Sequence, residues 1–463
     1  MKSCFGKSFT LRSWDTCRGL AKRWREEGVG AAETGFGDGA DDDSCPAVLF
    51  FKGNIPRELP WLSVFNSRKP RMVPPDAGWL EALRFLLKSL EAEGCVLAAS
   101  TGTLTYDLVA AHAERSALPL VMVMPFSLSG PAPEMPGTHS EHGGCAISCL
   151  PATNACPKAR RLVCRDRVLA AVSHAHLILE LRSGGNLATL LEEQQKRNPR
   201  FQFIFDPGEE NSSNAGNYRL IRNFSGNCER FSLPVSAGSR EAGPGPGPAR
   251  GTRISCPGPE RIEWPKFLYH YTRGCPGPWP GQSQTAFLLS LLDNDPRSGH
   301  SALDTLLRII SERRIRAGFK LVRGRGPVIS WSSHPPPEFC ALRRWNPAFA
   351  RWTVEPYGIA VSRDCLRGFD AKPAVYGGDE TYRMLPESER SRFQSSAAGR
   401  AAWRGEREWR SVGDLELDRI GDRSWFAFVP TAGEKEKILD LTGPELPVVA
   451  FEEISTRPDA CRT

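Results

Sequence analysis

The sequence lacks any apolar run long enough to cross a bilayer as a helix, since the longest, residues 118–126, has the length of a strand. Its basic N-terminus lacks the apolar segment of a secretory signal, and no internal repeat is visible. The first two absences argue against a helical membrane protein and against a secreted one. We expect a cytoplasmic protein with no membrane partner.

Paired cysteine knuckles, the usual mark of a structural zinc site, are also missing. The chain has 14 cysteines, but most of them are scattered. The densest group of potential ligands consists of His139, His142, Cys145, Cys149, Cys156 and Cys164. It has one CxxxC spacing and no second clean pair, so we expect a reduced loop and no metal, with a zinc site as the alternative left open.

What is present is the composition of a globular protein, with 40% hydrophobic and 24% charged residues. A chain of 463 residues is too long for one ordinary core, so we expect two or three domains. The net charge of +7 is compatible with an anionic ligand such as DNA or a nucleotide, and it requires none of them.

Two breaks in composition divide the chain. Residues 33–44 are acidic and glycine-rich, and residues 236–253 form a Gly/Pro-rich stretch that cannot pack a core. The parts that we expect are a variable extension (1–44), a first domain (45–225), a linker (226–262), a second domain (263–452) and a tail (453–463).

The first domain alternates short apolar strands with amphipathic helices. Its first helix has apolar residues at the 3.6 period, with Asp76 as the expected cap and Gly94 as the end. This alternation predicts a Rossmann-like α/β domain whose parallel sheet is covered on both faces. The second domain has shorter runs, more Trp and Pro, and one clear helix over residues 301–318. It is therefore expected to be a smaller α+β domain with a mainly antiparallel sheet.

Two glycine-containing turns follow strands of the first domain, at residues 99–107 and 182–190. In a parallel α/β sheet, ligands bind beyond the carboxyl ends of the strands, where such turns lead into helix N-termini. Free backbone N–H groups and the helix dipole favour phosphate there. The two turns predict a phosphate-binding pocket, and a purely geometric need for glycine is the alternative left open.

The segments SRKP (67–70), STGTLTYD (100–107), RDRVLAA (165–171) and ELRSGGNLATL (180–190) occur in this order. Together they resemble the Smf/DNA-processing-protein-A and LOG-like group of SLOG domains, over about residues 46–224. The resemblance implies a nucleotide- or nucleic-acid-binding pocket. It assigns to this pocket Ser67, Arg68, Ser100, Thr101, Asp107, Arg165, Arg167, Ser183, Gly184 and Gly185. Asn66 replaces the first glycine of the group, and the P-G-G-x-G-T-x-x-E run of nucleotide-cleaving members is missing, which implies binding rather than cleavage.

In the second domain, His270, Ser332 and Glu408 lie in this order on three expected strands. NAD-dependent ADP-ribosyl transfer needs a group that holds the nicotinamide ribose and a carboxylate that stabilises an oxocarbenium-like centre. We therefore predict that His270 grips NAD and that Glu408 is catalytic, with Ser332 in the same site. The alternatives left open are a core histidine, a strand-end serine cap, and a glutamate paired with Arg407 or Arg410.

The second domain also loosely resembles, over about residues 264–429, bacterial abortive-infection domains of the AbiGi-like kind. We expect a bacterial cytosolic protein in which an SLOG-like sensor domain is coupled to an effector domain, in phage defence or stress response. One alternative is a DNA-processing accessory protein that binds single-stranded DNA without turnover, and another is an NAD-dependent ADP-ribosyltransferase-like enzyme. No cofactor is required beyond a nucleotide or NAD as ligand, and homo-oligomerisation is left open.

Overall fold

The computed structural model describes residues 30–33, 48–56, 58–70, 72–74, 77–128, 144–150, 157–233, 262–295, 298–319, 322–323, 326–341, 345–346, 351–352, 354–395, 407–421 and 424–452. Asp76, His139, His142 and Cys156 lie outside these residues. The chain divides into two compact units. Unit 1 comprises Met1–Ser239 and Gly277–Ser298, and unit 2 comprises Arg240–Pro276 and Gly299–Thr463.

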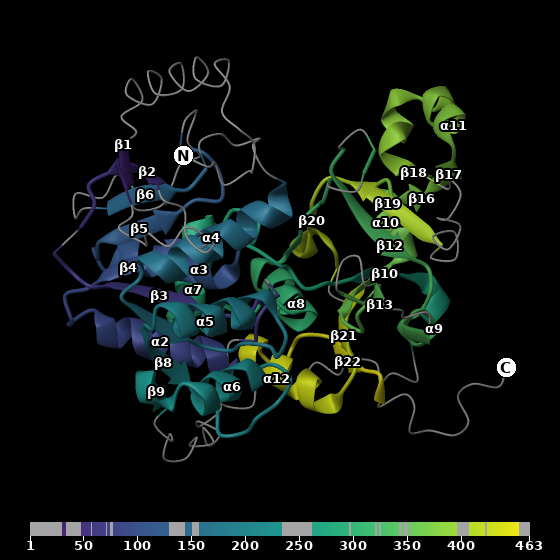
Figure 1. The fold of residues 1–463 in the computed structure, drawn as a ribbon. Helices are drawn as coiled ribbons and strands as arrows, with labels where there is room; N and C mark the ends of the chain where they lie inside the picture. The colour runs from purple at the N-terminus through teal and green to yellow at the C-terminus, as the bar shows by residue number, and fades with distance from the viewer. Residues whose placement is uncertain are drawn as a thin grey trace. The chain divides into compact units, whose positions relative to one another are not determined.

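Unit 1 contains a nine-stranded sheet with the order β1-β2-β6-β5-β4-β3-β7-β8-β9 (Figure 1). Its strands are β1 (Gly30–Glu33), β2 (Val48–Gly53), β3 (Trp61–Phe65), β4 (Val96–Ser100), β5 (Leu120–Val123), β6 (Gly144–Ser148), β7 (Ala175–Ile178), β8 (Phe201–Phe205) and β9 (Cys228–Phe231). From β6 to β9 all neighbours are parallel, whereas β1 and β2 pair antiparallel at one edge. The expected Rossmann-like parallel sheet is therefore confirmed.

Helices cover both faces of this sheet. Successive residues of a strand point to opposite faces, so neighbouring residues pack against different helices. The helices are α2 (Gly78–Leu90), α3 (Leu104–Arg115), α4 (Lys158–Val172), α5 (Asn186–Arg197) and α6 (Ala215–Asn223). Val64 of β3 packs with α2 and α3, while its neighbour Phe65 packs with α4, α5 and α6. Both residues are fully buried.

Four strands of unit 1 lie where the sequence predicts none, and the central strand β3 is one of them. β6 occupies part of the expected Cys/His-rich loop, and all five of its residues are buried between β5 and β2. β9 falls within residues 226–262, which are expected to be a linker, and β1 falls within the expected extension. The hydrogen-bond partners of β1, β6 and β9 come from other segments of the chain. The residues of these strands alone therefore do not indicate the pairing.

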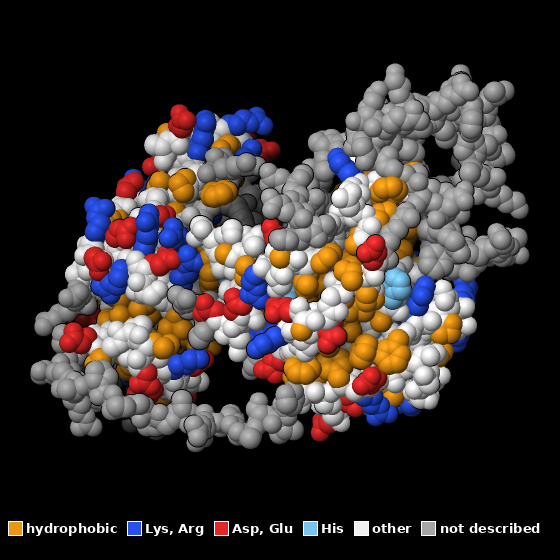
Figure 2. Space-filling view, turned by 90° about the vertical axis from the view of Figure 1, so that its left-hand side faces the viewer, with side chains coloured by type: hydrophobic (Ala, Val, Ile, Leu, Met, Phe, Trp, Pro, Cys, Tyr) orange, Lys and Arg blue, Asp and Glu red, His pale blue; other side chains and the backbone are white. Residues whose placement is uncertain are grey.

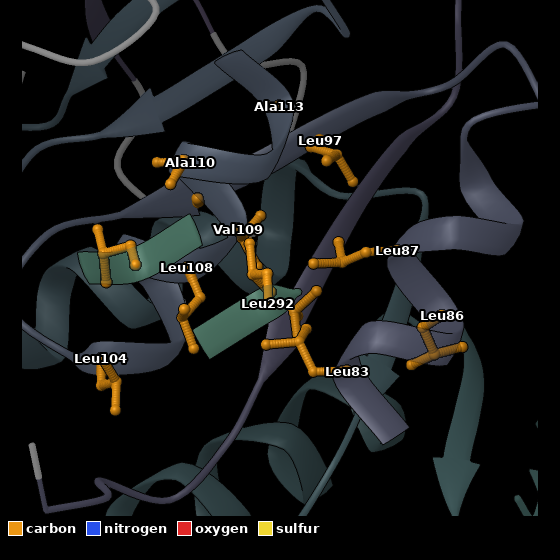
Figure 3. Close-up of a cluster of buried hydrophobic side chains, with 14 of the residues drawn as sticks. Leu83, Leu86, Leu87, Leu97, Leu104, Leu108, Val109, Ala110, Ala113 and Leu292 are labelled. Carbon is orange, nitrogen blue, oxygen red and sulfur yellow. The ribbon is translucent and has the colours of Figure 1, made fainter. Parts of the chain in front are cut away.

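The helix α7 (Gln284–Leu292) lies with unit 1, although the sequence places it in the second domain. Phe287, Leu288, Leu291 and Leu292 are buried in the same core as α2 and α3. Figure 3 shows Leu292 among Leu83, Leu87 and Val109. The side chain of Arg84 in α2 donates from Nε and Nη2 to the Leu291 carbonyl oxygen, at 2.9 and 2.7 Å. A nine-residue helix this apolar is stable only inside a core, and unit 1 supplies that core.

Unit 2 contains a seven-stranded sheet with the order β16-β19-β12-β10-β15-β21-β22. Its strands are β10 (Phe267–Tyr271), β12 (Val328–Ser332), β15 (Gly358–Ser362), β16 (Lys372–Pro373), β19 (Glu408–Val412), β21 (Trp425–Val429) and β22 (Val448–Ala450). All neighbours are antiparallel except β21 and β22. The expected α+β class with a mainly antiparallel sheet is confirmed.

The remaining elements of unit 2 are short, apart from two helices. They are α8 (Ala302–Glu312), α9 (Pro336–Ala341), α10 (Arg363–Gly368), α11 (Asp379–Met384) and α12 (Ala432–Thr442), with the two-stranded pairs β11 (Arg314–Ile315) and β20 (Leu415–Glu416), β13 (Trp345–Asn346) and β14 (Arg351–Trp352), and β17 (Val375–Gly377) and β18 (Phe393–Ser395). The capping box of Ser301 and Asp304 begins α8 as predicted, but the helix ends before Gly318. Arg313 adopts the left-handed conformation there, with a φ of 51°, and β11 follows at once.

Within the described residues, no helix is both long enough and apolar enough to span a membrane.

Candidate functional site

The strand order of unit 1 changes direction at β3. β4, β5 and β6 lie on one side of it, and β7, β8 and β9 lie on the other. In open α/β sheets, ligands bind in the crevice beyond the carboxyl ends of the strands at such a switch point. The residues that follow β3, β4 and β7 are therefore the candidate site, and they form three loops: 66–69, 101–103 and 179–185.

The loops after β3 and β7 are joined directly. The backbone N–H of Ser67 donates to the Glu180 carbonyl oxygen at 2.7 Å, and the Arg182 N–H donates to Ser67 Oγ at 2.9 Å. The Lys69 ammonium group forms an ion pair with the Glu180 carboxylate and lies over the Trp79 ring. Lys69 thus neutralises the acidic side chain at the switch point.

Asn66, which replaces the expected glycine, is only 7% exposed. Its Nδ2 donates to Thr105 Oγ1 at 3.1 Å. Its Oδ1 has no hydrogen-bond partner among the described residues. A buried amide oxygen that lacks a donor costs about 1–3 kcal/mol.

The second loop is held by the interior of the unit. Ser100 is fully buried, and its hydroxyl donates to the Val123 carbonyl oxygen at 2.5 Å. The Thr101 carbonyl oxygen accepts from Arg165 Nη1 at 2.7 Å, and Gly102 has a φ of 93°, which only glycine adopts without strain. Asp107 lies partly buried in the first turn of α3.

Arg165 is 5% exposed, and its guanidinium forms hydrogen bonds with other residues of the chain. Its Nε donates to Asp166 Oδ1 at 2.8 Å, and its guanidinium lies 5.1 Å from the centre of the Tyr106 ring. The Tyr106 hydroxyl donates to the same Asp166 oxygen at 3.0 Å. Burial raises the pKa of Asp166, and Arg165 opposes this rise. Arg165 is therefore a positioning residue for the Thr101 turn, while Arg167 is only partly buried.

The third loop leads into α5. Ser183 and Gly184 are exposed, and Gly184 has a φ of 68°, in the left-handed region. Gly185 is the N-cap residue of α5, which has no side-chain cap hydrogen bond. The first-turn N–H groups of such a helix carry partial positive charge and suit a phosphate. Arg68 and Arg182 are both exposed beside this turn.

Two residues of α6 that the sequence does not single out hold this third loop. Asn217 is fully buried, and its Oδ1 accepts from the Leu181 N–H at 2.9 Å. Its Nδ2 donates to the carbonyl oxygens of Leu179 and Phe205, at 2.7 and 2.8 Å. A Cβ on Gly216 would lie 2.8 Å from the Leu181 carbonyl oxygen. The run NSSNAGN (211–217) is the signal that could have pointed to them.

On the face that Figure 2 presents, basic and acidic side chains of the described residues are interspersed. The candidate site is defined by the local arrangement of its three loops.

In unit 2, the sheet does not bring His270 together with Ser332 and Glu408. Tyr269 pairs with Ser332, and Ser332 pairs with Glu408, so these three share one row on one face. His270 is the next residue along β10 and therefore points to the opposite face. Its Nδ1 lies 3.0 Å from the Ser330 carbonyl oxygen, and burial lowers its pKa.

The Glu408 carboxylate is also engaged. Arg410, which is 3% exposed, donates from Nε to Glu408 Oε1 at 2.9 Å. The same guanidinium donates to the carbonyl oxygens of Ser391 and Phe393. Ser332 Oγ accepts from the His334 N–H at 3.1 Å. These contacts match the structural alternatives, in which the serine caps a strand end and the glutamate is ion-paired.

No group of three or more His, Cys, Asp or Glu side chains within the described residues is placed to hold a metal ion. Cys145, Cys149 and Cys164 of the Cys/His-rich segment are described, and none of them is in a disulfide.

No protein-family model and no curated protein matches the chain. Among solved structures, DNA processing protein A from Streptococcus pneumoniae is similar with a TM-score of 0.37 and 14% identity, covering 48% of this chain and 77% of that chain. DNA processing protein A from Helicobacter pylori, described for its single-stranded DNA binding mode, has a TM-score of 0.34 and 18% identity, covering 44% of this chain and 90% of that chain. Similarity at this level carries no functional assignment, which has to come from the geometry of the site.

Proposed function

We propose that unit 1 binds the phosphate groups of a nucleotide or of single-stranded DNA at the carboxyl edge of its parallel sheet. The observation that carries this proposal is the direct joining of two loops at the switch point, where the Arg182 N–H donates to Ser67 Oγ. This bond holds the α5 turn and the β3 loop side by side.

The chemistry of the edge supports an anionic ligand. Arg68 and Arg182 are exposed there, and the N-terminus of α5 begins at Gly185. Phosphate oxygens accept well from such groups because the helix dipole and the guanidinium charges act together. The one acidic side chain of the joined loops, Glu180, is already neutralised by Lys69.

The wider proposals rest on the order of sequence motifs. They are that unit 2 is an effector coupled to this site, and that the protein acts in phage defence or stress response. The NAD-dependent alternative would need His270 and Glu408 in one cleft, and the two side chains project from opposite faces of the sheet. Binding at the edge of unit 1 is therefore the function that the geometry supports best.

The test is fluorescence anisotropy of a labelled single-stranded oligonucleotide with the full chain, over a range of salt concentrations. Wild type is expected to bind with an affinity that falls as salt rises, because phosphate contacts release counterions. Arg68→Ala and Arg182→Ala should each weaken binding and each reduce the salt slope by about 1.

Lys88→Ala is the matched control. Lys88 is exposed in the last turn of α2, which runs back from the switch point toward the amino edge of the sheet. Its replacement should leave affinity unchanged. Competition by an unlabelled mononucleotide separates a nucleotide site from one that needs a strand. Equal affinity of wild type and the two arginine variants would refute the proposal.

A further inference from the structure

Residues 277–298 form an excursion of the chain out of unit 2. The residues on both sides of it, Arg240–Pro276 and Gly299–Thr463, belong to unit 2, whereas the excursion itself belongs to unit 1. The chain therefore passes between the two units three times, after Ser239, Pro276 and Ser298. We call residues 277–298 the arm, and it contains α7.

The base of the arm is closed by hydrogen bonds within unit 2. The backbone N–H of Cys275 donates to the His300 carbonyl oxygen at 2.8 Å, and His300 Nδ1 lies 3.1 Å from the Cys275 carbonyl oxygen. The Thr272 hydroxyl donates to the carbonyl oxygen of Ala302, the first residue of α8, at 2.7 Å. These bonds join the end of β10 to the start of α8. Unit 2 therefore holds both ends of the arm side by side through its own contacts.

The tip of the arm is α7, and one face of this helix is buried in unit 1. The buried side chains recur at a spacing of four residues and pack in the core that contains α2 and α3 (Figure 3); they are Phe287, Leu288, Leu291 and Leu292. Gln284 and Thr285, by contrast, are exposed. The arm thus contacts α2 and α3 through an apolar face of α7.

Polar contacts fix the end of α7 at one place on these helices. The carbonyl groups in the last turn of a helix lack intrahelical partners, and Arg84 of α2 supplies two donors to the Leu291 carbonyl oxygen. Arg115, at the end of α3, forms an ion pair with Asp293, the C-cap residue of α7. Both helices of unit 1 therefore contribute a directed contact as well as apolar surface.

We propose that residues 277–298 are a docking arm, and that α2 and α3 form a helix-binding surface whose partner is this arm. The surface holds the part of the chain after residue 240 to unit 1 without needing a peptide bond between them. The proposal does not depend on ligand binding at the carboxyl edge, because it concerns only contacts of α7 with α2 and α3.

The length and composition of α7 favour the docked state. A helix of nine residues is too short to persist by itself in water, where about 12–15 residues are needed even for good helix formers. Undocking would therefore unfold α7 and expose its four apolar side chains to water. The helix and its surface stabilise each other, as in other complexes of an apolar helix face with a groove.

The arm packs on the two helices that follow loops of the candidate site. α2 follows the loop 66–69, and α3 follows the loop 101–103. The Thr103 hydroxyl caps α3, and Asn66 donates to Thr105 in the first turn of the same helix. The surface that binds the arm is therefore formed by elements that also carry two of the three site loops.

The first experiment cuts the chain between the units and asks whether the pieces stay together. A site for a sequence-specific protease is inserted after Gly245 in the full chain, which carries an affinity tag at its N-terminus. After cleavage, residues 246–463 should be retained with the tagged piece and should sediment with it as a 1:1 complex. Separation of the two pieces on cleavage would overturn the proposal.

The second experiment compares dissociation constants of the cleaved complex, from sedimentation velocity over a dilution series. Leu291→Ala should raise the dissociation constant by about 100-fold, because it removes packing from the buried face of α7. Arg84→Met, on the other piece, removes both donors to the Leu291 carbonyl oxygen and should raise it by about 10-fold. Thr285→Ala, on the exposed side of α7, is the matched control and should leave it unchanged.

Circular dichroism of the uncut variants shows whether each is folded, and Arg84→Met decides the matter if Leu291→Ala is not. Equal dissociation constants of wild type and of the folded variants would overturn the proposal, since α7 would then contribute nothing to holding the pieces together.

Discussion

Replacing Arg165 by methionine tests the positioning role of this arginine. The change keeps most of the apolar stem but removes the charge that faces Asp166 and the donor to the Thr101 carbonyl oxygen. Breaking a buried ion pair from one side costs about 3–5 kcal/mol, because the remaining charge is left without a partner. The Asp166 side chain is 21% exposed, so the lower end of this range, about 3 kcal/mol, is expected.

The assay is hydrogen exchange of the β4 and β5 amides, read by mass spectrometry, because it reports the opening of unit 1 separately from unit 2. A loss of about 3 kcal/mol corresponds to exchange that is faster by about 100-fold. The double variant Arg165→Met with Asp166→Asn should recover at least about 1 kcal/mol, since the asparagine still accepts from the Tyr106 hydroxyl and carries no charge.

The pH dependence of this loss has a definite sign. Burial raises the folded-state pKa of Asp166, and removing Arg165 raises it further. A carboxyl group whose folded pKa is raised is penalised when ionised, so the deficit of Arg165→Met should be larger at pH 7.5 than at pH 5. Wild-type protection in Arg165→Met together with loss of ligand binding would refute the positioning role, and would place Arg165 against the ligand instead.

Three further outcomes are expected. Leu291→Ala should destabilise unit 1 by about 3 kcal/mol in the same exchange assay. The control Leu441→Ala, at a leucine that is 64% exposed, should change stability by less than about 0.5 kcal/mol. If Leu291→Ala reduced protection only in unit 2, the position of α7 in the core of unit 1 would be contradicted. Gly216→Ala should lower the melting temperature by the equivalent of about 1–3 kcal/mol, because its Cβ would meet Leu181, and an unchanged melting temperature would argue against that close approach. Burial lowers the pKa of His176 to about 4, so the stability that the neutral side chain contributes is present above the unfolded pKa of 6.5 and is lost as pH falls toward 4. Over this pH range, thermal melts of His176→Gln should show a loss of stability that is smaller than that of wild type by up to about 3 kcal/mol. Parallel pH profiles of stability for the two proteins would contradict this expectation.

The local pattern of the chain was enough to predict most of unit 1. Four of the five residues of the buried strand β4 are apolar. Of the six apolar residues that the helical spacing predicts for α2, all except Leu90 are buried. These features depend on residues close together in the sequence, and periodicity reports them directly. The same holds for the capping box of α8.

The site was only partly predictable. The turns at Ser67, Thr101 and Gly184 lie at the carboxyl edge as expected, because parallel strands bring their carboxyl ends to one edge. Arg165 was predicted as a pocket residue, yet its contacts are with Asp166 and Thr101, since the direction of a side chain on a helix depends on what packs over it.

The sequence by itself determined the fold class of each unit and the turns that gather at the switch point, because both follow from short-range periodicity and from glycine placement. The tertiary structure alone decided two further matters. α7 joins the core of unit 1, and His270 and Glu408 project from opposite faces of one sheet. Each depends on which distant segments share a core or a strand register, and no local pattern encodes that pairing.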